Sequence, residues 1–168
     1  LRRQYSIMLK YIETAVVFSE IPDEISLDIN ITNCPYRCPG CHSAYLQQDI
    51  GSDLTTDKID ELIKKNTGIS CVLLSGGDCN PEEIKRLAEH IHKTYPELKT
   101  AMYSGAPKAW KILWESKVLD YYKIGPWIKS KGPLDSPTTN QRLYKLTDAG
   151  YIDITHRFIE KKEKTLLL

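Results

Sequence analysis

The sequence has little net charge, no long apolar run and no repeated or low-complexity segment. Its 168 residues include 23 Lys and Arg against 22 Asp and Glu, which gives a formal net charge of +1. This balance argues against a broad electrostatic surface for nucleic acid or an anionic membrane. No apolar stretch approaches the roughly 20 residues that span a bilayer, and the N-terminus lacks a signal-peptide pattern. We therefore expect a cytoplasmic protein that binds neither nucleic acid nor membrane.

Strand and helix patterns alternate along most of the chain. Apolar residues at every second position predict a strand over 25–32, and helical spacing predicts a helix over 56–66. The apolar run 71–75 predicts a buried strand, and Asn80 followed by Pro81 predicts the start of a long helix. The other expected elements are strands at 99–103 and 118–124, a helix at 107–114, an extra strand or hairpin within 5–24, and a strand pair from RLYKLT and YIDITHRF around Ala149–Gly150.

Strands and helices that alternate in this way predict an α/β fold with a mostly parallel sheet and right-handed crossovers. A complete eight-fold barrel needs about 200 residues or more, so we expect a partial, incomplete β/α barrel. No linker-like segment divides the chain, which predicts a single domain over residues 1–168.

Three of the five cysteines lie within one short loop, NITNCPYRCPGCHSAY (30–45). Cys34, Cys38 and Cys41 follow the predicted strand 25–32, and an odd cluster of this kind does not suit a disulfide framework. Three thiolates can hold an iron–sulfur cubane and leave one of its irons open. A structural zinc site normally has four ligands, and the fourth here would have to be His42, Cys71 or Cys79.

Glycine-rich loops follow three other predicted strands. They are Ser75-Gly76-Gly77-Asp78, Tyr103-Ser104-Gly105 and Gly125-Pro126. Because parallel folds place their sites at the carboxyl ends of the strands, we expect these loops to lie beside the cysteine loop on one edge of the sheet. Glycine permits positive φ angles and a close approach of backbone to a ligand.

The C-x3-C-x2-C spacing resembles the signature of the radical S-adenosylmethionine superfamily, and Ser75-Gly76-Gly77-Asp78 resembles its Gly-Gly-Glu type motif, with Asp in place of Glu. The resemblance implies a fold of the radical S-adenosylmethionine type and two cofactors, a [4Fe-4S] cluster and S-adenosylmethionine at the open iron. Many members carry an aromatic residue before the third cysteine, which packs on the adenine, whereas this chain has Gly40. The residues that the resemblance implies are Cys34, Cys38 and Cys41 for the cluster, Gly76, Gly77 and Asp78 for the methionine end, Tyr103 and Ser104 near the ribose, and Gly40 to His42 through their backbone.

Three segments are similar to the anaerobic ribonucleotide reductase activating proteins: NCPYRCPGCHS, LLSGGD and KIGPWI…SPTTNQRLYKL. The similarity runs from about Leu9 to Phe158 and implies an activase that generates a 5′-deoxyadenosyl radical and places a glycyl radical on the large subunit of anaerobic ribonucleoside-triphosphate reductase. The similarity also implies a reductant protein such as flavodoxin and is compatible with a homodimer. The radical reaction that it implies requires no catalytic acid or base. The residues most particular to this similarity, Asn140, Gln141 and Arg142, are expected to face the partner or the cofactor.

Three alternatives share the cysteine loop. Two are radical enzymes, an activator of the pyruvate formate-lyase type and an enzyme acting on a small molecule, and the segment Thr139-Asn140-Gln141-Arg142 favours the reductase activase over both. The third is a non-enzymatic module that binds zinc or a cluster and interacts with other proteins. Metal analysis separates a radical enzyme from a zinc-binding module, because a cubane contains iron and sulfide whereas a structural site contains zinc.

Overall fold

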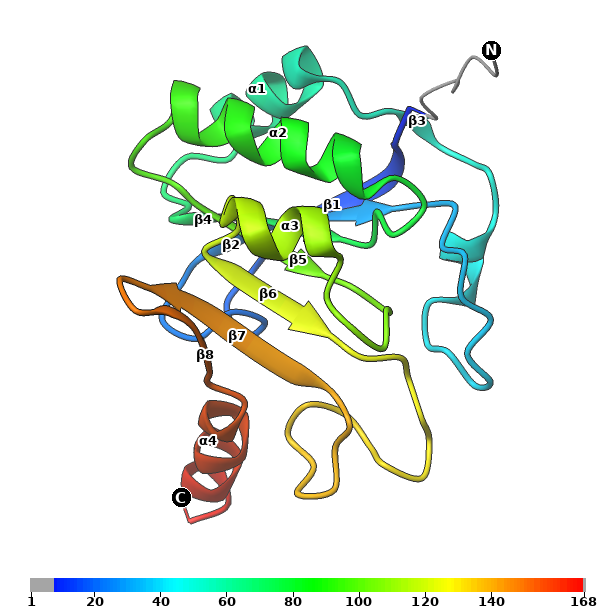
Figure 1. Cartoon of the computed structure of the whole chain (residues 1–168), viewed down its shortest axis with the longest axis vertical. Helices are drawn as coiled ribbons and strands as arrows, with labels where there is room; N and C mark the ends of the chain where they lie inside the picture. Colours follow the sequence, from blue (N-terminus) through cyan, green and yellow to red (C-terminus); the bar gives the residue numbers. More distant parts are fainter. Residues whose placement is uncertain (1–7, 168) are drawn as a thin grey trace.

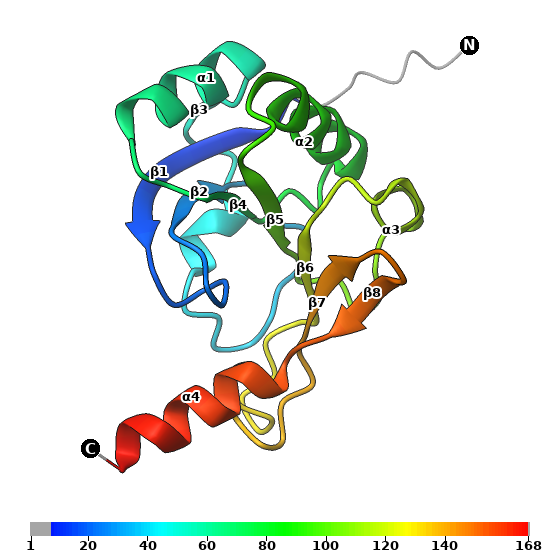
Figure 2. The same cartoon turned by 90° about the vertical axis from the view of Figure 1, so that its left-hand side faces the viewer.

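The computed structural model describes residues 8–167 and shows an α/β fold built on one open eight-stranded sheet (Figures 1 and 2). The strand order is β3-β1-β2-β4-β5-β6-β7-β8, so that β3 and β8 form the two edges. The strands are β1 (Lys10–Val17), β2 (Ser26–Ile31), β3 (Ser52–Asp53), β4 (Cys71–Ser75), β5 (Lys99–Tyr103), β6 (Tyr121–Ile124), β7 (Arg142–Thr147) and β8 (Gly150–Asp153). The helices are α1 (Thr56–Lys65), α2 (Pro81–Thr94), α3 (Lys111–Ser116), α4 (His156–Leu166) and the 3₁₀ helix η1 (Ala44–Gln47).

The sheet is mixed, and the prediction of a mostly parallel sheet is wrong. β2, β4, β5 and β6 pair in parallel, whereas β1 and β3 on one side and β7 and β8 on the other pair antiparallel. The central strands are joined through α1, α2 and α3, whereas a short turn joins β7 to β8 and longer loops lead from β2 to β3 and from β6 to β7. The partial barrel and the single domain stay predictions; residues 1–7 and 168 of that domain lie outside the described residues.

The main core lies between the sheet and the three helices α1, α2 and α3, which cover the same face (Figure 2). Alternate residues of the central strands point into it, and the apolar stripes of α1 and α2 meet them. Side-chain caps fix where these helices begin: Thr55 accepts from the Lys58 amide, and Asn80 accepts from the Glu83 amide at 3.2 Å. The core residues on the central strands include Leu27, Ile29, Ile31, Val72, Leu74, Met102 and Tyr122.

A smaller apolar cluster covers part of the opposite face of the sheet. Cys71, Leu73, Ala101 and Tyr121 pack there against Ile21, Leu143 and Ile154 from the flanking segments. Beyond this cluster, toward the carboxyl ends of the central strands, the same face is lined by polar residues. The second cluster therefore ends where the candidate site begins.

Several predicted elements are confirmed and others begin or end elsewhere. β2, α1, β4 and β5 match their predicted ranges to within a residue or two, and α2 begins at Pro81 as predicted. β1 lies within the predicted segment 5–24, of which residues 5–7 are not described. The helix predicted at 107–114 begins at Lys111, and the strand predicted at 118–124 begins at Tyr121. The strand pair around Ala149–Gly150 is confirmed as β7 and β8, but the end of YIDITHRF belongs to α4.

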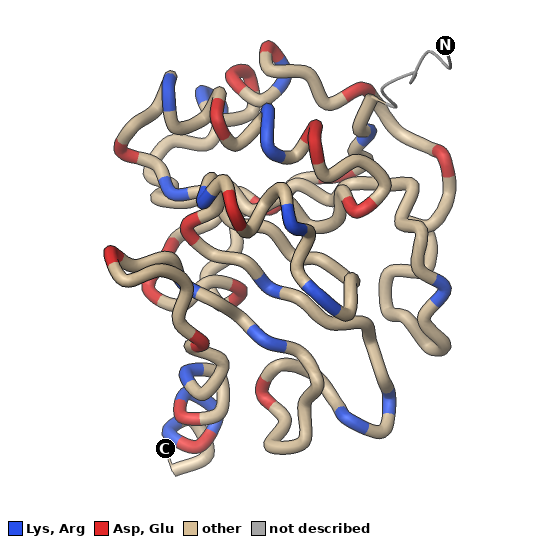
Figure 3. Tube along the Cα trace, in the orientation of Figure 1, with Lys and Arg blue, Asp and Glu red and all other residues tan. Residues whose placement is uncertain are grey.

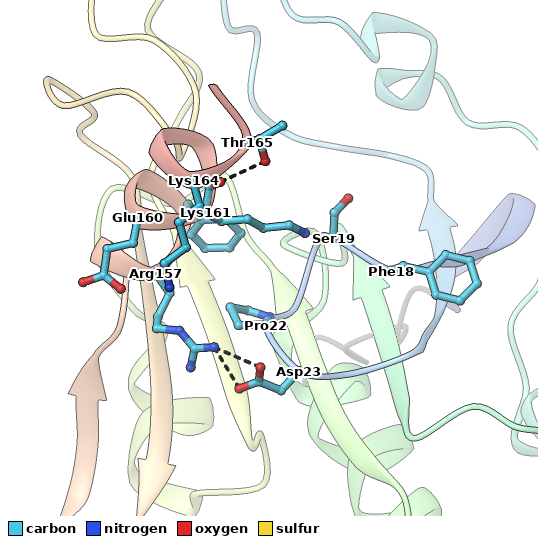
Figure 4. Close-up of a pocket in the computed structure, with 10 residues that line it drawn as sticks. Phe18, Ser19, Pro22, Asp23, Arg157, Glu160, Lys161, Lys164 and Thr165 are labelled. Carbon is cyan, nitrogen blue, oxygen red and sulfur yellow. Dashed lines mark hydrogen bonds and ion pairs between the residues drawn. The ribbon is translucent and has the colours of Figure 1, made fainter. Parts of the chain in front are cut away.

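α4 extends away from the sheet as a separate arm, as Figures 1 and 2 show. None of its described side chains is buried. Arg157 anchors it through a two-pronged contact with Asp23, in which the guanidinium Nη2 lies 2.9 and 3.0 Å from the two carboxylate oxygens (Figure 4). Over residues 8–167, every helix is too short or too polar to cross a bilayer.

Candidate metal and cofactor site

A row of side chains crosses the sheet at the carboxyl ends of the parallel strands. The strand register places Asn30 of β2 beside Ser75 of β4, Ser75 beside Tyr103 of β5, and Tyr103 beside Lys123 of β6. Paired residues of neighbouring strands point to the same face of a sheet. The row therefore lies on the face away from α1, α2 and α3, and the loops that follow these strands extend past it (Figure 1).

These loops enclose a cavity of about 280 Å³. The cysteine loop forms one side, and the loops after β4, β5 and β6 form the others. The residues that line it include Cys34, Cys38 and Cys41, the row residues Asn30, Ser75, Tyr103 and Lys123, and Tyr36, Gly76, Asp78, Ser104, Gly105, Gly125, Trp127 and Gln141. The structure thus brings most of the residues that the sequence singled out to one place.

A second cavity, of about 340 Å³, lies between α4 and the turn after β1 (Figure 4). Its lining includes Phe18, Pro22 and the charged side chains of Arg157, Glu160 and Lys164, and it contains no cysteine. The cavity with the three thiols is therefore the better candidate for metal chemistry.

Backbone hydrogen bonds hold the cysteine loop at its base. The Asn33 amide donates to the Gln48 carbonyl at 3.2 Å and the Cys34 amide donates to the Leu46 carbonyl at 3.0 Å. Nearer its tip, the Cys41 amide donates to the Cys38 carbonyl at 3.2 Å, which makes a tight turn between these two cysteines. Burial raises the pKa of the Cys34 thiol, so metal binding at this residue must displace a proton that the folded protein holds firmly.

The Tyr36 ring joins the cysteine loop to the loop after β5. A Cβ atom on Gly105 would lie only 2.9 Å from Cδ2 of Tyr36, so a larger residue at position 105 would push the ring away. Because glycine has no side chain, position 105 leaves room for the Tyr36 ring. The contact brings the cysteine loop over the end of β5.

Gly76 and Gly77 play different parts in the loop after β4. Both have positive φ angles, +108° and +97°. Gly76 lines the cavity, and its amide donates to the Tyr103 carbonyl at 2.9 Å. A Cβ on Gly77 would lie 2.3 Å from Cδ1 of Ile84, so this glycine allows the loop to pack against α2.

Asp78 ties the loops after β4 and β5 together. Its buried carboxylate accepts from the Ser104 hydroxyl at 2.5 Å, from Trp110 Nε1 at 2.7 Å and from the Gly105 amide at 3.0 Å. Ionised carboxylates offer about four acceptor positions, so one more donor from a ligand could be accommodated. Asp78 and Ser104 thus shape the cavity wall as well as lining it.

Lys123 places a positive charge in the cavity wall. Its side chain is buried, and Nζ donates to the carbonyls of Gly125 at 2.9 Å and Ser104 at 3.2 Å. Burial lowers the pKa of this ammonium to about 8, which leaves it mostly protonated at neutral pH. The sequence analysis missed Lys123, because a lysine in the run YYKI is ordinarily a solvent-facing residue of a strand.

Trp127 lies beside the glycine that replaces an aromatic residue before the third cysteine. A Cβ on Gly40 would be 3.8 Å from Trp127 Nε1, and the exposed ring of His42 meets the indole edge-on at a centroid distance of 4.9 Å. Trp127 Nε1 is buried and has no hydrogen-bond partner among the described residues. An aromatic surface therefore borders the cysteine loop, but it comes from the loop after β6, which no spacing in the sequence indicated.

Asn140, Gln141 and Arg142 have three different surroundings. Asn140 Nδ2 donates to the Pro126 carbonyl at 2.9 Å and fixes the loop after β6. The buried Gln141 lines the cavity, whereas the exposed Arg142 does not line it and lies 3.8 Å from an Asp153 oxygen. Of the three, only Gln141 borders the cavity.

The two remaining cysteines lie outside the cavity lining. Cys71 is buried in the smaller apolar cluster, and Cys79 is half-buried against the main core, with Sγ 4.0 Å from the Thr32 carbonyl. Among residues 8–167, no three His, Cys, Asp or Glu side chains converge as ligands of a single ion. A cubane does not require such convergence, because its thiolates bind different irons.

Residues 26–145 match the family model described as a 4Fe-4S single cluster domain. The match includes all four loops of the cavity, the cysteine loop among them, and it covers well over half of the chain. The chain belongs to this family. The comparisons with curated proteins and with solved structures gave no match. Family membership identifies an iron–sulfur protein, and the donor set fits, because three thiols from one loop face a common cavity.

Proposed function

We propose that this iron–sulfur protein is a radical S-adenosylmethionine activase that places a glycyl radical on the large subunit of anaerobic ribonucleoside-triphosphate reductase. One observation carries the proposal: the three thiols of a single loop share a cavity with the glycine loop after β4 and with polar residues of β5. Three thiolates leave one iron of a cubane free for a ligand, and the cavity offers polar groups beside them.

Cys34, Cys38 and Cys41 would hold the cluster, and Gly76, Asp78 and Ser104 would line the place of the methionine end of S-adenosylmethionine. When bound, the cluster supplies the electron that cleaves S-adenosylmethionine into methionine and the 5′-deoxyadenosyl radical, which takes a hydrogen atom from a glycine Cα. The protein positions the reactants and limits access of water.

Trp127 would take over the part of the aromatic residue that is absent at Gly40. Its indole borders the cysteine loop, and its buried N–H has no partner among the described residues, so that it could donate to a ligand nitrogen or oxygen. Aromatic rings stack well on nucleobases, which suits the adenine of S-adenosylmethionine.

The surface around the cavity suits a protein partner. The loops 33–47, 104–110 and 125–134 contain Arg37, Lys108, Lys129 and Lys131, all exposed, and no Asp or Glu (Figure 3). We call these four residues the basic rim. The apolar surface of Pro39, Trp127 and Ile128 lies next to it. A basic rim beside apolar residues would receive an acidic, partly apolar surface of the reductase or of an electron donor such as flavodoxin.

The test is anaerobic reconstitution followed by mixing with the large reductase subunit, S-adenosylmethionine and a one-electron reductant. We expect about four iron and four sulfide per chain, and a doublet electron paramagnetic resonance signal on the reductase, split by the remaining glycine α-hydrogen. A reductase with that glycine changed to Ala should give no doublet. A wild-type pair that forms no protein radical, while a small metabolite alone stimulates cofactor cleavage, would contradict the activase and favour a small-molecule radical enzyme.

A zinc-binding interaction module is the second candidate. Among the described residues no three His, Cys, Asp or Glu side chains converge on a single ion, and Cys71 and Cys79 lie outside the cavity lining. Structural zinc normally requires four ligands. About one zinc per chain, without sulfide, would favour this candidate over the cluster.

A further inference from the structure

Lys123 is a buried cation that forms no ion pair within residues 8–167, although the charge of the Asp78 carboxylate acts on it from a greater distance. Its exposed fraction is 8%, and the two groups that accept from Nζ, the carbonyls of Ser104 and Gly125, are both neutral. The Tyr103 ring lies 5.8 Å from Nζ, and no Asp or Glu within residues 8–167 forms an ion pair with it. An ammonium group has three N–H donors, of which the two carbonyls occupy two.

A buried charge that lacks a counter-charge destabilises the folded protein. Asp78 lines the same cavity, but its carboxylate already accepts from Ser104, Gly105 and Trp110 and forms no ion pair with Lys123 in the described structure. The three thiols of the cysteine loop line the same cavity as Lys123. An anion seated between these thiols and the sheet would therefore compensate the ammonium.

We propose that Lys123 provides the fixed positive charge that offsets the anionic, thiolate-ligated cluster in this cavity and makes reduction of the cluster more favourable. This inference rests on the cluster-binding part of the proposed function. Reduction adds one electron from an external one-electron donor and makes the cluster more negative. A nearby cation in a region of low dielectric constant therefore stabilises the reduced form more than the oxidised form.

A carboxylate of a small molecule bound beside the cluster would present the same negative charge to Lys123. The two sources differ in one respect that can be measured. A cation that acts on the cluster affects its reduction potential when no small molecule is present. A cation that acts only on a carboxylate leaves that potential unchanged and affects the affinity for the small molecule.

The experiment compares Lys123→Met, which keeps the length of the side chain and removes its charge, with Lys123→Arg, which keeps the charge. Lys111→Met is the matched control, because Lys111 lies on α3 with 84% of its side chain exposed. Each protein is loaded with iron and sulfide, and its reduction potential is titrated without S-adenosylmethionine. Absorption spectra and iron content confirm equal loading.

We expect the reduction equilibrium constant of Lys123→Met to fall at least tenfold, which corresponds to a shift of about 59 mV to more negative potential. Lys123→Arg and Lys111→Met should stay close to the wild type. Loss of the cluster from Lys123→Met with retention in Lys123→Arg would equally support a requirement for charge. An unchanged potential in Lys123→Met, or loss of the cluster from both Lys123 variants, would overturn the inference.

Thermal unfolding supplies a second readout that does not depend on potential. Because the cluster-free protein contains the unpaired ammonium, Lys123→Met should unfold at a higher temperature than the wild type without the cluster and at a lower temperature with it. Destabilisation of both forms to the same extent would mean that Lys123 only ties together the backbone of Ser104 and Gly125. A wild-type protein that binds no iron would refute the cluster itself, which is a different result.

Discussion

At the scale of single residues, the five cysteines divide into three that line the cavity and two that do not. We expect Cys34→Ser, Cys38→Ser and Cys41→Ser each to lose most of the bound iron, because a hydroxyl is a poor substitute for a thiolate ligand. Cys79→Ser is the matched control, since Cys79 is half-buried but does not line the cavity. Iron and sulfide analysis after identical reconstitution measures the effect. Equal loss of iron from Cys79→Ser would contradict the assignment of Cys34, Cys38 and Cys41 as the cluster ligands.

Trp127 permits a second test at this scale. If its indole packs on adenine, Trp127→Leu should weaken S-adenosylmethionine binding by about 1–3 kcal/mol, the range found for stacking between an aromatic side chain and a base. Trp127→Phe keeps an aromatic face and should lose less. Calorimetry or equilibrium dialysis with cluster-loaded protein gives the affinity, and iron content shows whether the cluster is intact. Unchanged affinity in Trp127→Leu would assign the adenine to another surface.

The residues that the sequence did not indicate share a physical property. Lys123 lies in β6 and Trp127 in the loop after it, and both line the cavity with the cysteines because only β4 and β5 separate β6 from β2 in the sheet. The spacing of cysteines and the pairs of glycines can be read from the sequence. The proximity of β6 to the cysteine loop depends on the order of the strands in the sheet. The three thiols, Gly76 and Ser104 could therefore be predicted, and the side chains opposite them could not.

At the scale of elements, the periodicity of apolar residues predicted the helices and strands that bury one face in the core. α1 and α2 carry apolar residues that meet the sheet at regular intervals, and their caps at Thr55 and Asn80 mark where they begin. None of the described side chains of α4 is buried, and only Phe158 packs against the smaller apolar cluster, so the core does not determine where this helix begins and ends. α3 starts after Trp110, whose indole donates to Asp78 from an extended backbone, and the packing of this side chain is a tertiary contact.

The pairing of β2 with β4 makes stability depend on pH. Asp28 of β2 accepts from the Ser75 hydroxyl of β4 at 2.5 Å, yet burial raises the pKa of this carboxyl to about 6. The folded state holds this proton more tightly than the unfolded chain does. The contribution of Asp28 to the free energy of unfolding is therefore greatest below pH 4 and falls as the pH rises through 6. Two pKa units correspond to at most about 3 kcal/mol.

Asp28→Asn removes this titration while keeping a side chain of the same shape. We expect the variant to be more stable than the wild type at pH 8 and to show a smaller difference at pH 4. Urea denaturation of the cluster-free protein at both values measures the free energy of unfolding. Ser19→Ala offers a comparison, because Ser19 lies in an exposed turn and its amide and hydroxyl donate to the neighbouring Glu20. A stability difference between Asp28→Asn and the wild type that does not change with pH would contradict the assignment.

At the scale of the whole molecule, the charge is nearly balanced but unevenly distributed. The net charge is +1, whereas the segments 33–47, 104–110 and 125–134 beside the cavity contain four exposed basic residues and no acidic one (Figure 3). Overall charge therefore says little about partners in this case. The order of the strands brings loops from distant parts of the sequence together, and these loops contain the basic rim as well as residues that line the cavity.

The basic rim predicts that encounter with the large reductase subunit depends on salt. Raising the ionic strength from 0.15 M to 1 M shortens the Debye length from about 8 Å to about 3 Å and should slow association if opposite charges guide it. The double variant Lys129→Glu/Lys131→Glu reverses two charges of the rim and should associate more slowly than the wild type at low salt, with a weaker response to added salt.

The control Lys161→Glu/Lys164→Glu makes the same change on α4, whose side chains border the other cavity. Stopped-flow association measures the rate, and the yield of glycyl radical shows whether the complex is productive. An equal effect of both double variants would mean that only net charge matters, and a partner that binds across α4 would be slowed more by the control.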